Sequence, residues 1–295
     1  MGPLTYIALA AGAGAALLAV YAFFVEPRIV RLEKLDVPVP DLPSVFDGLR
    51  IAHLTDMHVG GRAYWNRASR RAIEVANECK PDLVVLTGDL VHRDPYAHDA
   101  AELLQPLNAP LGVWTVLGNH DYNWTWTSRV RRSSVRTCSD EQWANLLRGA
   151  GVTMLANESV AIERDGRRLW LAGCGDPYCL RDDLPRTLRS VHDGEPCVLL
   201  CHSPDIVDHP LAPRAALVLC GHTHGGQVRL PLVGPIYAPC HRPRERSRGL
   251  VRVAGTLMYA NRGIGASNIL RFHCPPEVAL ITLRCSPQKK NGAST

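Results

Sequence analysis

The stretch Asp82-Leu83-Val84-Val85-Leu86-Thr87-Gly88-Asp89 decides the fold class of this chain. Its centre is a short, continuous apolar run with β-branched valines, which predicts a buried strand at residues 82–87. Residues 66–79, just before it, carry apolar side chains at helical spacing, at Ala68, Ala72, Ile73 and Ala76. A helix followed by a buried strand that ends in glycine and an acidic residue is typical of the parallel sheets of α/β proteins.

Similar patterns on both sides of this stretch predict the remaining elements. In the first half we expect strands at residues 49–55 and 112–117, and helices at residues 100–107 and 141–148. In the second half Asp165-Gly166 is a hairpin signal, and the predicted strands are residues 160–163, 168–173, 197–201, 215–220, 226–231, 250–254, 256–260 and 278–284. We therefore expect an α/β core, a second sheet packed on it and helices on the outer faces, which is a four-layer αββα sandwich.

The N-terminus predicts one transmembrane helix within residues 1–26. Residues 5–25 carry no charge, and 21 residues at helical rise span a bilayer core of roughly 30 Å. A cleaved signal peptide is the alternative, although no basic residue precedes the run and the run is long for such a signal. Arg28, Arg31 and Lys34 follow the run, so the positive-inside rule predicts a single-pass protein of the inner membrane with a cytoplasmic domain. Export of the domain is the alternative.

The rest of the chain divides into three parts. Residues 27–48 contain four prolines and predict an extended connector with one edge strand. Residues 49–285 form the predicted domain, and the polar residues 286–295 form a predicted disordered tail.

Charge and cysteine content exclude some classes of function. The net charge of +5 over 295 residues is too small and too dispersed to indicate a nucleic-acid partner, but it suits an anionic membrane or substrate. The ten cysteines include no C-x-x-C pair, and several lie in apolar runs. We expect them to be small buried side chains, with a disulfide framework as the alternative. The sequence makes no prediction of the oligomeric state.

Five segments directly after predicted strands carry side chains that bind metal ions. They are Asp56-Met57-His58, Gly88-Asp89, Gly118-Asn119-His120-Asp121, His202 and Gly221-His222-Thr223-His224. Each alone is compatible with an ordinary turn. Strand ends meet at one edge of a sheet, so we expect the five segments to meet there.

The number and type of these side chains predict two divalent metal ions. Seven ligands, Asp56, His58, Asp89, Asn119, His202, His222 and His224, exceed what one ion needs, so two ions sharing a bridging carboxylate are expected. Carboxylate, amide and imidazole ligands suit Mn²⁺, Zn²⁺ or Fe²⁺. Two adjacent ions are a known arrangement for displacement at phosphorus.

Together, these motifs resemble the signature of the calcineurin-like metallophosphoesterases, over residues 50–285. Residues 221–227, 263–267 and 275–277 are similar to the membrane-anchored or exported bacterial phosphodiesterase branch. The resemblance implies the αββα sandwich of that family. It also implies that Asp56, His58 and His224 hold one ion, that Asn119, His202 and His222 hold the other, and that Asp89 bridges them. A metal-bridging hydroxide would be the nucleophile.

The resemblance assigns catalytic roles to two further residues. His120 would protonate the leaving oxygen or stabilise the transition state without binding metal, and Asp121 would orient His120. Beyond this loop lie Arg129, Arg131, Arg132 and Arg136, interleaved with tryptophans. We interpret these arginines as a substrate-binding lid that grips phosphate, and a solvated loop is the alternative.

The predicted activity is dinuclear, metal-dependent hydrolysis of phosphodiester or pyrophosphate bonds at the membrane surface. Some anchored relatives are similar to UDP-2,3-diacylglucosamine hydrolases, which implies a lipid pyrophosphate of lipid A synthesis as one substrate class. A broad-specificity phosphodiesterase or phosphatase is the alternative. A non-catalytic metal-binding scaffold would be expected to have lost some of the ligands, and a nuclease of the same superfamily would be expected to carry a DNA-binding extension and no membrane span.

Overall fold

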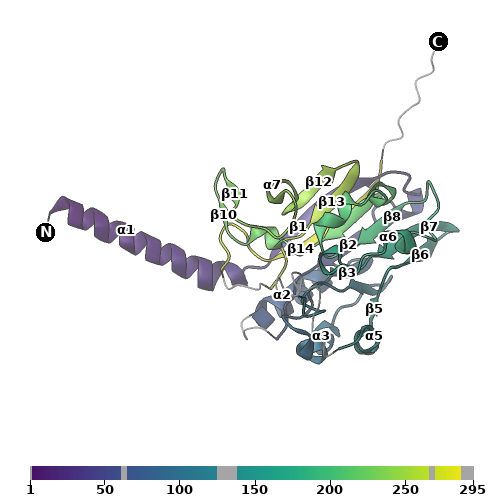
Figure 1. Cartoon of the computed structure of the whole chain (residues 1–295), viewed down its shortest axis with the longest axis horizontal. Coiled ribbons are helices and arrows are strands. Elements are labelled where there is room, and N and C mark those ends of the chain that lie inside the picture. Colours follow the sequence, from purple (N-terminus) through teal and green to yellow (C-terminus); the bar gives the residue numbers. More distant parts are fainter. Residues whose placement is uncertain (1, 61–64, 125–137, 266–269, 287–295) are drawn as a thin grey trace, which may run out of the picture.

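The computed structural model describes residues 2–60, 65–124, 138–265 and 270–286. A long helix projects from a domain built around two packed sheets (Figure 1). The predicted arginine lid, residues 129–136, lies outside the described residues, as does nearly all of the predicted tail.

The first sheet has six strands in the order β1-β14-β2-β3-β4-β5. β2, β3, β4 and β5 are mutually parallel, whereas β14 is antiparallel to β2 and parallel to β1. The strands are β1 (Arg31–Val39), β2 (Arg50–Leu54), β3 (Leu83–Thr87), β4 (Val113–Val116), β5 (Val152–Met154) and β14 (Glu277–Cys285). All five residues of β3 are buried, as its continuous apolar run predicts.

One feature of the first sheet differs from the expectation. β14 was expected in the second group of strands but lies between β1 and β2, where Ile281 pairs with Ile51. Its register with two partners depends on contacts more than 200 residues away, which no local pattern records. The connector supplies one edge strand, as expected: β1 pairs with β14 along nine positions and forms that edge of the sheet.

The second sheet has the order β12-β13-β9-β8-β7-β6. Its strands are β6 (Glu158–Arg164), β7 (Arg167–Gly173), β8 (Cys197–Leu200), β9 (Leu217–Cys220), β12 (Gly249–Val253) and β13 (Thr256–Ala260). β7, β8, β9 and β13 are mutually parallel, and each edge strand is antiparallel to its neighbour. The predicted strand at 226–231 is reduced to β10 (Arg229–Leu230), which pairs with β11 (Gly234–Pro235) in a separate hairpin.

Three apolar layers hold the sandwich together. α2 (Trp65–Glu78), α3 (Ala97–Leu104) and α5 (Asp140–Gly149) cover the outer face of the first sheet, with Trp143 and Leu147 fully buried there. Residues such as Ile51, Val85 and Leu219 fill the space between the sheets. The outer face of the second sheet is covered by short pieces, α6 (Leu184–Thr187), η6 (Pro204–Asp208) and η7 (Ala212–Arg214). The chain therefore has the four-layer fold that was expected, with a thin fourth layer.

The N-terminal helix is long and apolar enough to cross a membrane. α1 (Pro3–Val20) continues through a π turn, η1 (Tyr21–Val25), and a 3-10 turn, η2 (Glu26–Arg28). Within this 26-residue run an 18-residue window has a mean hydropathy of 2.1, and only 6% of that window is buried. The helix projects away from the domain (Figure 1). A signal sequence near an N-terminus has the same apolar character.

The cysteines behave as small apolar side chains. All ten lie among the described residues, none is in a disulfide, and seven are buried. Burial of most cysteines as small apolar side chains agrees with the expectation.

Candidate metal centre

The five predicted ligand segments meet at the ends of five parallel strands. β2, β3 and β4 of the first sheet and β8 and β9 of the second each end two or three residues before a predicted ligand. All seven predicted ligand residues are buried, with at most 6% of the surface of each residue exposed. The site thus lies where the ends of the two sheets come together.

One group of three side chains joins the first and last segments. Nε2 of His224 lies 3.3 Å from Oδ1 of Asp56 and 3.1 Å from Nε2 of His58. These are the three residues that the resemblance assigned to one ion, and their ligand atoms lie close enough together to hold one.

A second group combines Asp89, His202 and His222. Nε2 of His202 lies 3.2 Å from Oδ2 of Asp89 and 3.2 Å from Nδ1 of His222. The same Asp89 oxygen lies 3.7 Å from Nε2 of His58, which belongs to the first group. Asp89 therefore stands between the two groups, where a bridging carboxylate is required.

Asn119 completes the set. Its Nδ2 donates to the carbonyl oxygen of Trp124 at 3.1 Å, which orients the amide. Its Oδ1 is buried and accepts no hydrogen bond from any described residue, and the same is true of Oδ1 of Asp56. Buried acceptors without a donor are costly unless a cation satisfies them. Four imidazoles and three oxygen-bearing side chains with such orphaned atoms fit a pair of divalent ions.

Surrounding hydrogen bonds fix the orientation of the ligands. His202 Nδ1 donates to the Thr87 carbonyl at 2.6 Å, which turns Nε2 toward Asp89. Oδ2 of Asp56 accepts from the backbone N–H of His222 at 3.1 Å, and this leaves Oδ1 for the centre. Such outer contacts select the tautomer and aim the ligand atom.

The backbone at the centre is strained. Asp56, His58, Asp89, His222 and His224 all have positive φ, between 48° and 67°. Non-glycine residues rarely adopt this left-handed region, and holding one there costs on the order of 1–3 kcal/mol. Strain of this kind persists only where the surrounding structure enforces it.

Two glycines permit the close approach of the ligand segments. Gly221 packs against the first segment, and a Cβ added to it would lie 2.0 Å from Oγ1 of Thr55. Gly88 has φ of +84°, and an added Cβ would lie 2.6 Å from the backbone nitrogen of Gly118. Any side chain at either position would push the segments apart.

Burial sets the protonation states of four of the ligands. It lowers the pKa of His222 to about 3 and holds the pKa of His58 and of His224 well below the ordinary value. These imidazoles are therefore neutral near pH 7, which is the form that binds metal. Burial also raises the pKa of Asp56 to about 7, because a negative charge there lacks compensation that a cation would supply.

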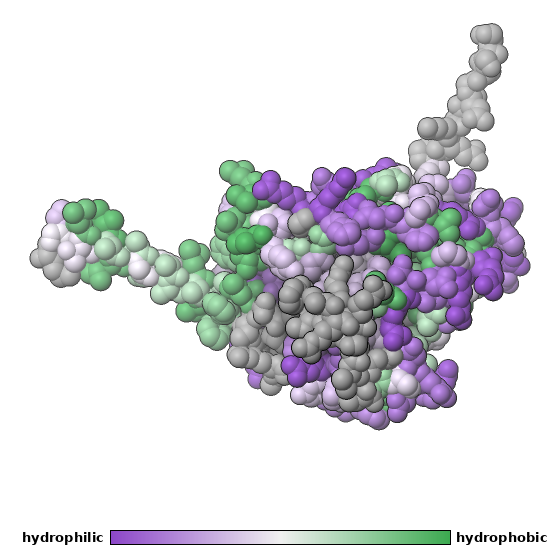
Figure 2. All heavy atoms as spheres, viewed as in Figure 1, coloured by the Kyte–Doolittle hydropathy of each residue, from purple (hydrophilic) through white to green (hydrophobic). Residues whose placement is uncertain are grey.

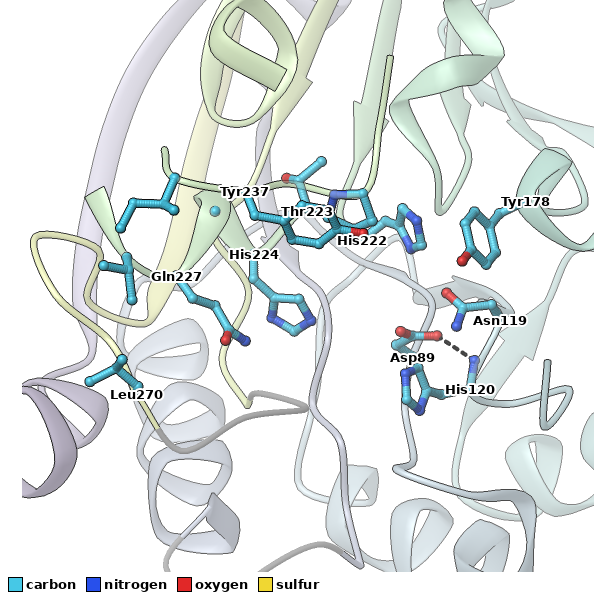
Figure 3. A pocket seen from close by; sticks show the side chains of 14 residues that line it. Asp89, Asn119, His120, Tyr178, His222, Thr223, His224, Gln227, Tyr237 and Leu270 are labelled. Carbon is cyan, nitrogen blue, oxygen red and sulfur yellow. Dashed lines mark hydrogen bonds between the residues drawn. The ribbon is translucent and has the colours of Figure 1, made fainter. Parts of the chain in front are cut away.

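His120 lies beside both ligand groups and belongs to neither of them. Its backbone N–H donates to Oδ1 of Asp89 at 2.8 Å, and its ring Nδ1 lies 2.9 Å from the carbonyl oxygen of His92. That contact makes Nδ1 the donor, so Nε2 is the ring atom left to face the site (Figure 3).

The contacts of Asp121 differ from those expected of a residue that orients the His120 ring. Its carboxylate accepts from the backbone N–H groups of Gly118, at 2.8 Å, and Val91, at 3.1 Å, and it does not bond the His120 ring. Asp121 is fully buried and joins two ligand loops, while the His92 carbonyl orients His120. A backbone carbonyl carries no sequence signal, so the sequence did not point to residue 92.

A cavity of about 530 Å³ opens from the centre. One end is lined by Asp89, Asn119, His120, His222 and His224. Apolar and aromatic side chains, Val228, Ile236, Tyr237 and Leu270, also line the cavity, and Figure 3 shows Leu270 at the end away from Asp89 and His120. Tyr178, which the sequence did not suggest, also lines it, with its ring centroid 4.7 Å from that of His222.

Comparison with known proteins gives a consistent family. The calcineurin-like phosphoesterase family matches residues 49–226. The uncharacterized metallophosphoesterase YkuE of Bacillus subtilis is 32% identical over 96% of this chain and 94% of its own length. The phosphodiesterase YaeI of Escherichia coli is 32% identical over 79% of this chain and 82% of its own. The UDP-2,3-diacylglucosamine pyrophosphatase LpxG of Chlamydia trachomatis is 27% identical over 90% of this chain and 92% of its own.

Proposed function

The chain belongs to the calcineurin-like phosphoesterase family and is a metal-dependent phosphohydrolase, and we propose that it cleaves a phosphodiester or pyrophosphate bond in a lipid-linked substrate at the membrane surface. A UDP-linked lipid is the leading candidate. The observation that carries the proposal is the single cavity that metal-binding and apolar side chains line together.

The seven buried side chains are proposed to hold two divalent ions. Asp56, His58 and His224 form one set, Asn119, His202 and His222 the other, and Asp89 serves both, in keeping with the distances above. The chemistry that such ions supply when bound is polarisation of the phosphoryl group and activation of water. The identity of the ions is open among Mn²⁺, Zn²⁺ and Fe²⁺.

His120 is proposed to move the proton that the leaving group needs. Its Nδ1–H is committed to the His92 carbonyl, so a second proton on the ring resides on Nε2. His120 lines the cavity beside Asp89 and Asn119, within reach of a phosphoryl group held at the ligands. Its backbone N–H, bonded to Asp89, also keeps the bridging carboxylate in place.

The apolar part of the cavity is proposed to hold the acyl portion of the substrate. Ile236 and Tyr237 belong to the segment after β11 and remain 64% and 72% exposed, and Leu270 also lines the cavity. Such a lining favours a substrate with an apolar part. LpxG is named as a pyrophosphatase of a diacylated UDP-sugar, which supports the same substrate class.

A panel of substrates tests the proposal on the purified full chain with added Mn²⁺, Zn²⁺ or Fe²⁺. It comprises bis-p-nitrophenyl phosphate, a UDP-sugar, and UDP-2,3-diacylglucosamine in mixed micelles. We expect kcat/KM to be highest for the lipid and to fall for the lipid in Ile236→Asp but not in Ala161→Asp, an exposed control on β6. Cleavage of the diester alone would instead favour a broad phosphodiesterase, and cleavage of nothing would favour a metal-binding scaffold.

A further inference from the structure

The β10–β11 hairpin carries an apolar tip that faces solvent. Leu232, in the turn, is fully exposed, and Val233 beside it is 50% exposed. Leu230, Ile236 and Tyr237 extend this surface along both arms of the hairpin, with 42%, 64% and 72% of their surfaces exposed. A cluster of exposed large apolar side chains on one small element marks a surface that contacts something other than water.

The base of the hairpin is tied to the base of the N-terminal helix. The backbone of Phe272 accepts from Arg229 and donates to Gln227, both at 2.9 Å, so residues 271–274 run alongside the hairpin. The preceding residue, Arg271, donates its backbone N–H to the carbonyl oxygen of Ala22 at 3.1 Å. The carboxylate of Glu26 accepts from the backbone of residues 273 and 274. The hairpin and the helix therefore hold a defined position relative to each other.

This position places the hairpin at the level where the helix leaves the domain. In Figure 1 the hairpin lies at the end of the domain from which α1 projects, and Figure 2 shows its apolar atoms at that same end, beside those of the helix. Three exposed aromatic residues of the helical run, Tyr21, Phe23 and Phe24, also lie at its domain end, and a fourth, Tyr6, lies near its other end. Aromatic side chains gather at the interface between bilayer and water, which sets the level of the membrane surface.

A second cavity, of about 420 Å³, lies against the hairpin and is distinct from the catalytic cavity. It is lined by hairpin residues 229–235 and by three further basic residues, Arg244, Arg248 and His273. Its described lining includes no acidic residue. Among the described residues, no carboxylate lies within 4 Å of the three guanidinium groups. Arg229 is held in place by the Gly225 carbonyl at 2.7 Å and the Ser247 hydroxyl at 3.0 Å. Uncompensated arginines around a cavity suit a phosphate group, which they bind in a forked geometry.

We propose that the β10–β11 hairpin is a second membrane-contact element, whose tip enters the bilayer interface while the arginine cavity holds the phosphate headgroups of anionic lipids. Because Ile236 and Tyr237 continue from this hairpin into the lining of the catalytic cavity, its seating directs the apolar mouth of that cavity toward the bilayer. A lipid substrate would then enter from the membrane without crossing water. The inference rests on the membrane anchorage in the proposed function, and it does not depend on the reaction catalysed.

The test measures the depth of the hairpin directly. Leu232→Trp is introduced into the full chain, which is placed in nanodiscs of phosphatidylcholine with acyl chains brominated as a quencher, with or without phosphatidylglycerol. Emission of the added tryptophan is obtained by difference from the unsubstituted chain, because six native tryptophans are present. Arg167→Trp, at an exposed position on β7 at the far end of the domain, is the matched control.

We expect at least about twofold quenching of the residue 232 tryptophan in nanodiscs containing phosphatidylglycerol, as for a side chain at the headgroup–acyl boundary, and none for residue 167. Arg244→Glu with Arg248→Glu should reduce that quenching, whereas Arg186→Glu with Arg189→Glu, exposed near α6, should not. Equal quenching of the tryptophans at residues 232 and 167 would overturn insertion of the tip. Quenching that is indifferent to phosphatidylglycerol and to the arginine substitutions would overturn the headgroup site. Failure of the full chain to enter nanodiscs would overturn the anchor, and loss of hydrolysis alone would leave this inference standing.

Discussion

Replacement of His120 by alanine separates catalysis from metal binding at this centre. The His120 ring donates a hydrogen bond to the His92 carbonyl, whereas the contact with Asp89 comes from the backbone N–H, which alanine retains. The two ligand groups and their surrounding hydrogen bonds are therefore expected to persist in His120→Ala. In the proposed mechanism, the substitution removes the proton donor at Nε2.

The size of the effect follows from that loss. A positioned acid contributes about 10²–10⁴ in rate, which corresponds to roughly 3–5 kcal/mol of transition-state stabilisation. We expect kcat for a phosphodiester with an alkoxide leaving group to fall by that factor, and kcat for bis-p-nitrophenyl phosphate to fall less, because p-nitrophenolate leaves without a proton. The metal content per chain should stay near that of the unsubstituted protein. A leaving group that needs no proton should be cleaved with a smaller loss, since the acid assists only its departure.

The assay combines steady-state hydrolysis with elemental analysis of protein purified without chelator. His192→Ala, an exposed histidine beyond α6, is the matched control and should change neither quantity. Loss of bound metal from His120→Ala would refute the reasoning, because it would make His120 a ligand. A rate within about threefold of the unsubstituted enzyme, for the diester with the alkoxide leaving group, would equally refute its role as the acid.

Four further changes probe the centre, the anchor and the domain. Asp89→Ala should lose metal and activity together, by elemental analysis and diester hydrolysis, because this carboxylate stands between both ligand groups; retention of two ions would contradict its bridging role. Removal of residues 1–25 should leave hydrolysis of a soluble diester nearly unchanged and lower turnover of a lipid substrate by about tenfold or more, and equal losses would contradict a role limited to membrane attachment. Arg271→Leu should lower the free energy of unfolding by about 3 kcal/mol, because the buried guanidinium of Arg271 donates to four backbone carbonyls. Urea unfolding in detergent measures the change, and a decrease below about 1 kcal/mol would contradict a stabilising role of these bonds. Gly221→Ala should reduce the metal content, because the added Cβ would meet Thr55, whereas Gly149→Ala, with open space around it, should not.

The ligand segments of the metal centre could be recognised in the sequence because the pattern that marks each segment is local. Each ligand segment follows a short apolar strand, and a strand end places the next residues at the edge of a sheet whatever its neighbours are. The residue types within a segment, such as Asp56 and His58, specify metal chemistry without reference to the rest of the chain. The apolar run of residues 5–25 is local in the same sense, because its length and lack of charge suffice to mark a span.

Only the tertiary structure decided which distant residues meet. His58 and His224 are 166 positions apart, and their 3.1 Å approach depends on the packing of two sheets. β14 lies in the first sheet because it pairs with β1 and β2, which are far from it in the sequence. His92 orients His120 through its backbone carbonyl, a group that every residue type has. The seating of the β10–β11 hairpin beside the helix depends on backbone hydrogen bonds through residues 271–274. Backbone bonding of this kind is independent of side-chain identity, and long-range packing is a property of the whole chain, so neither leaves a pattern in the sequence.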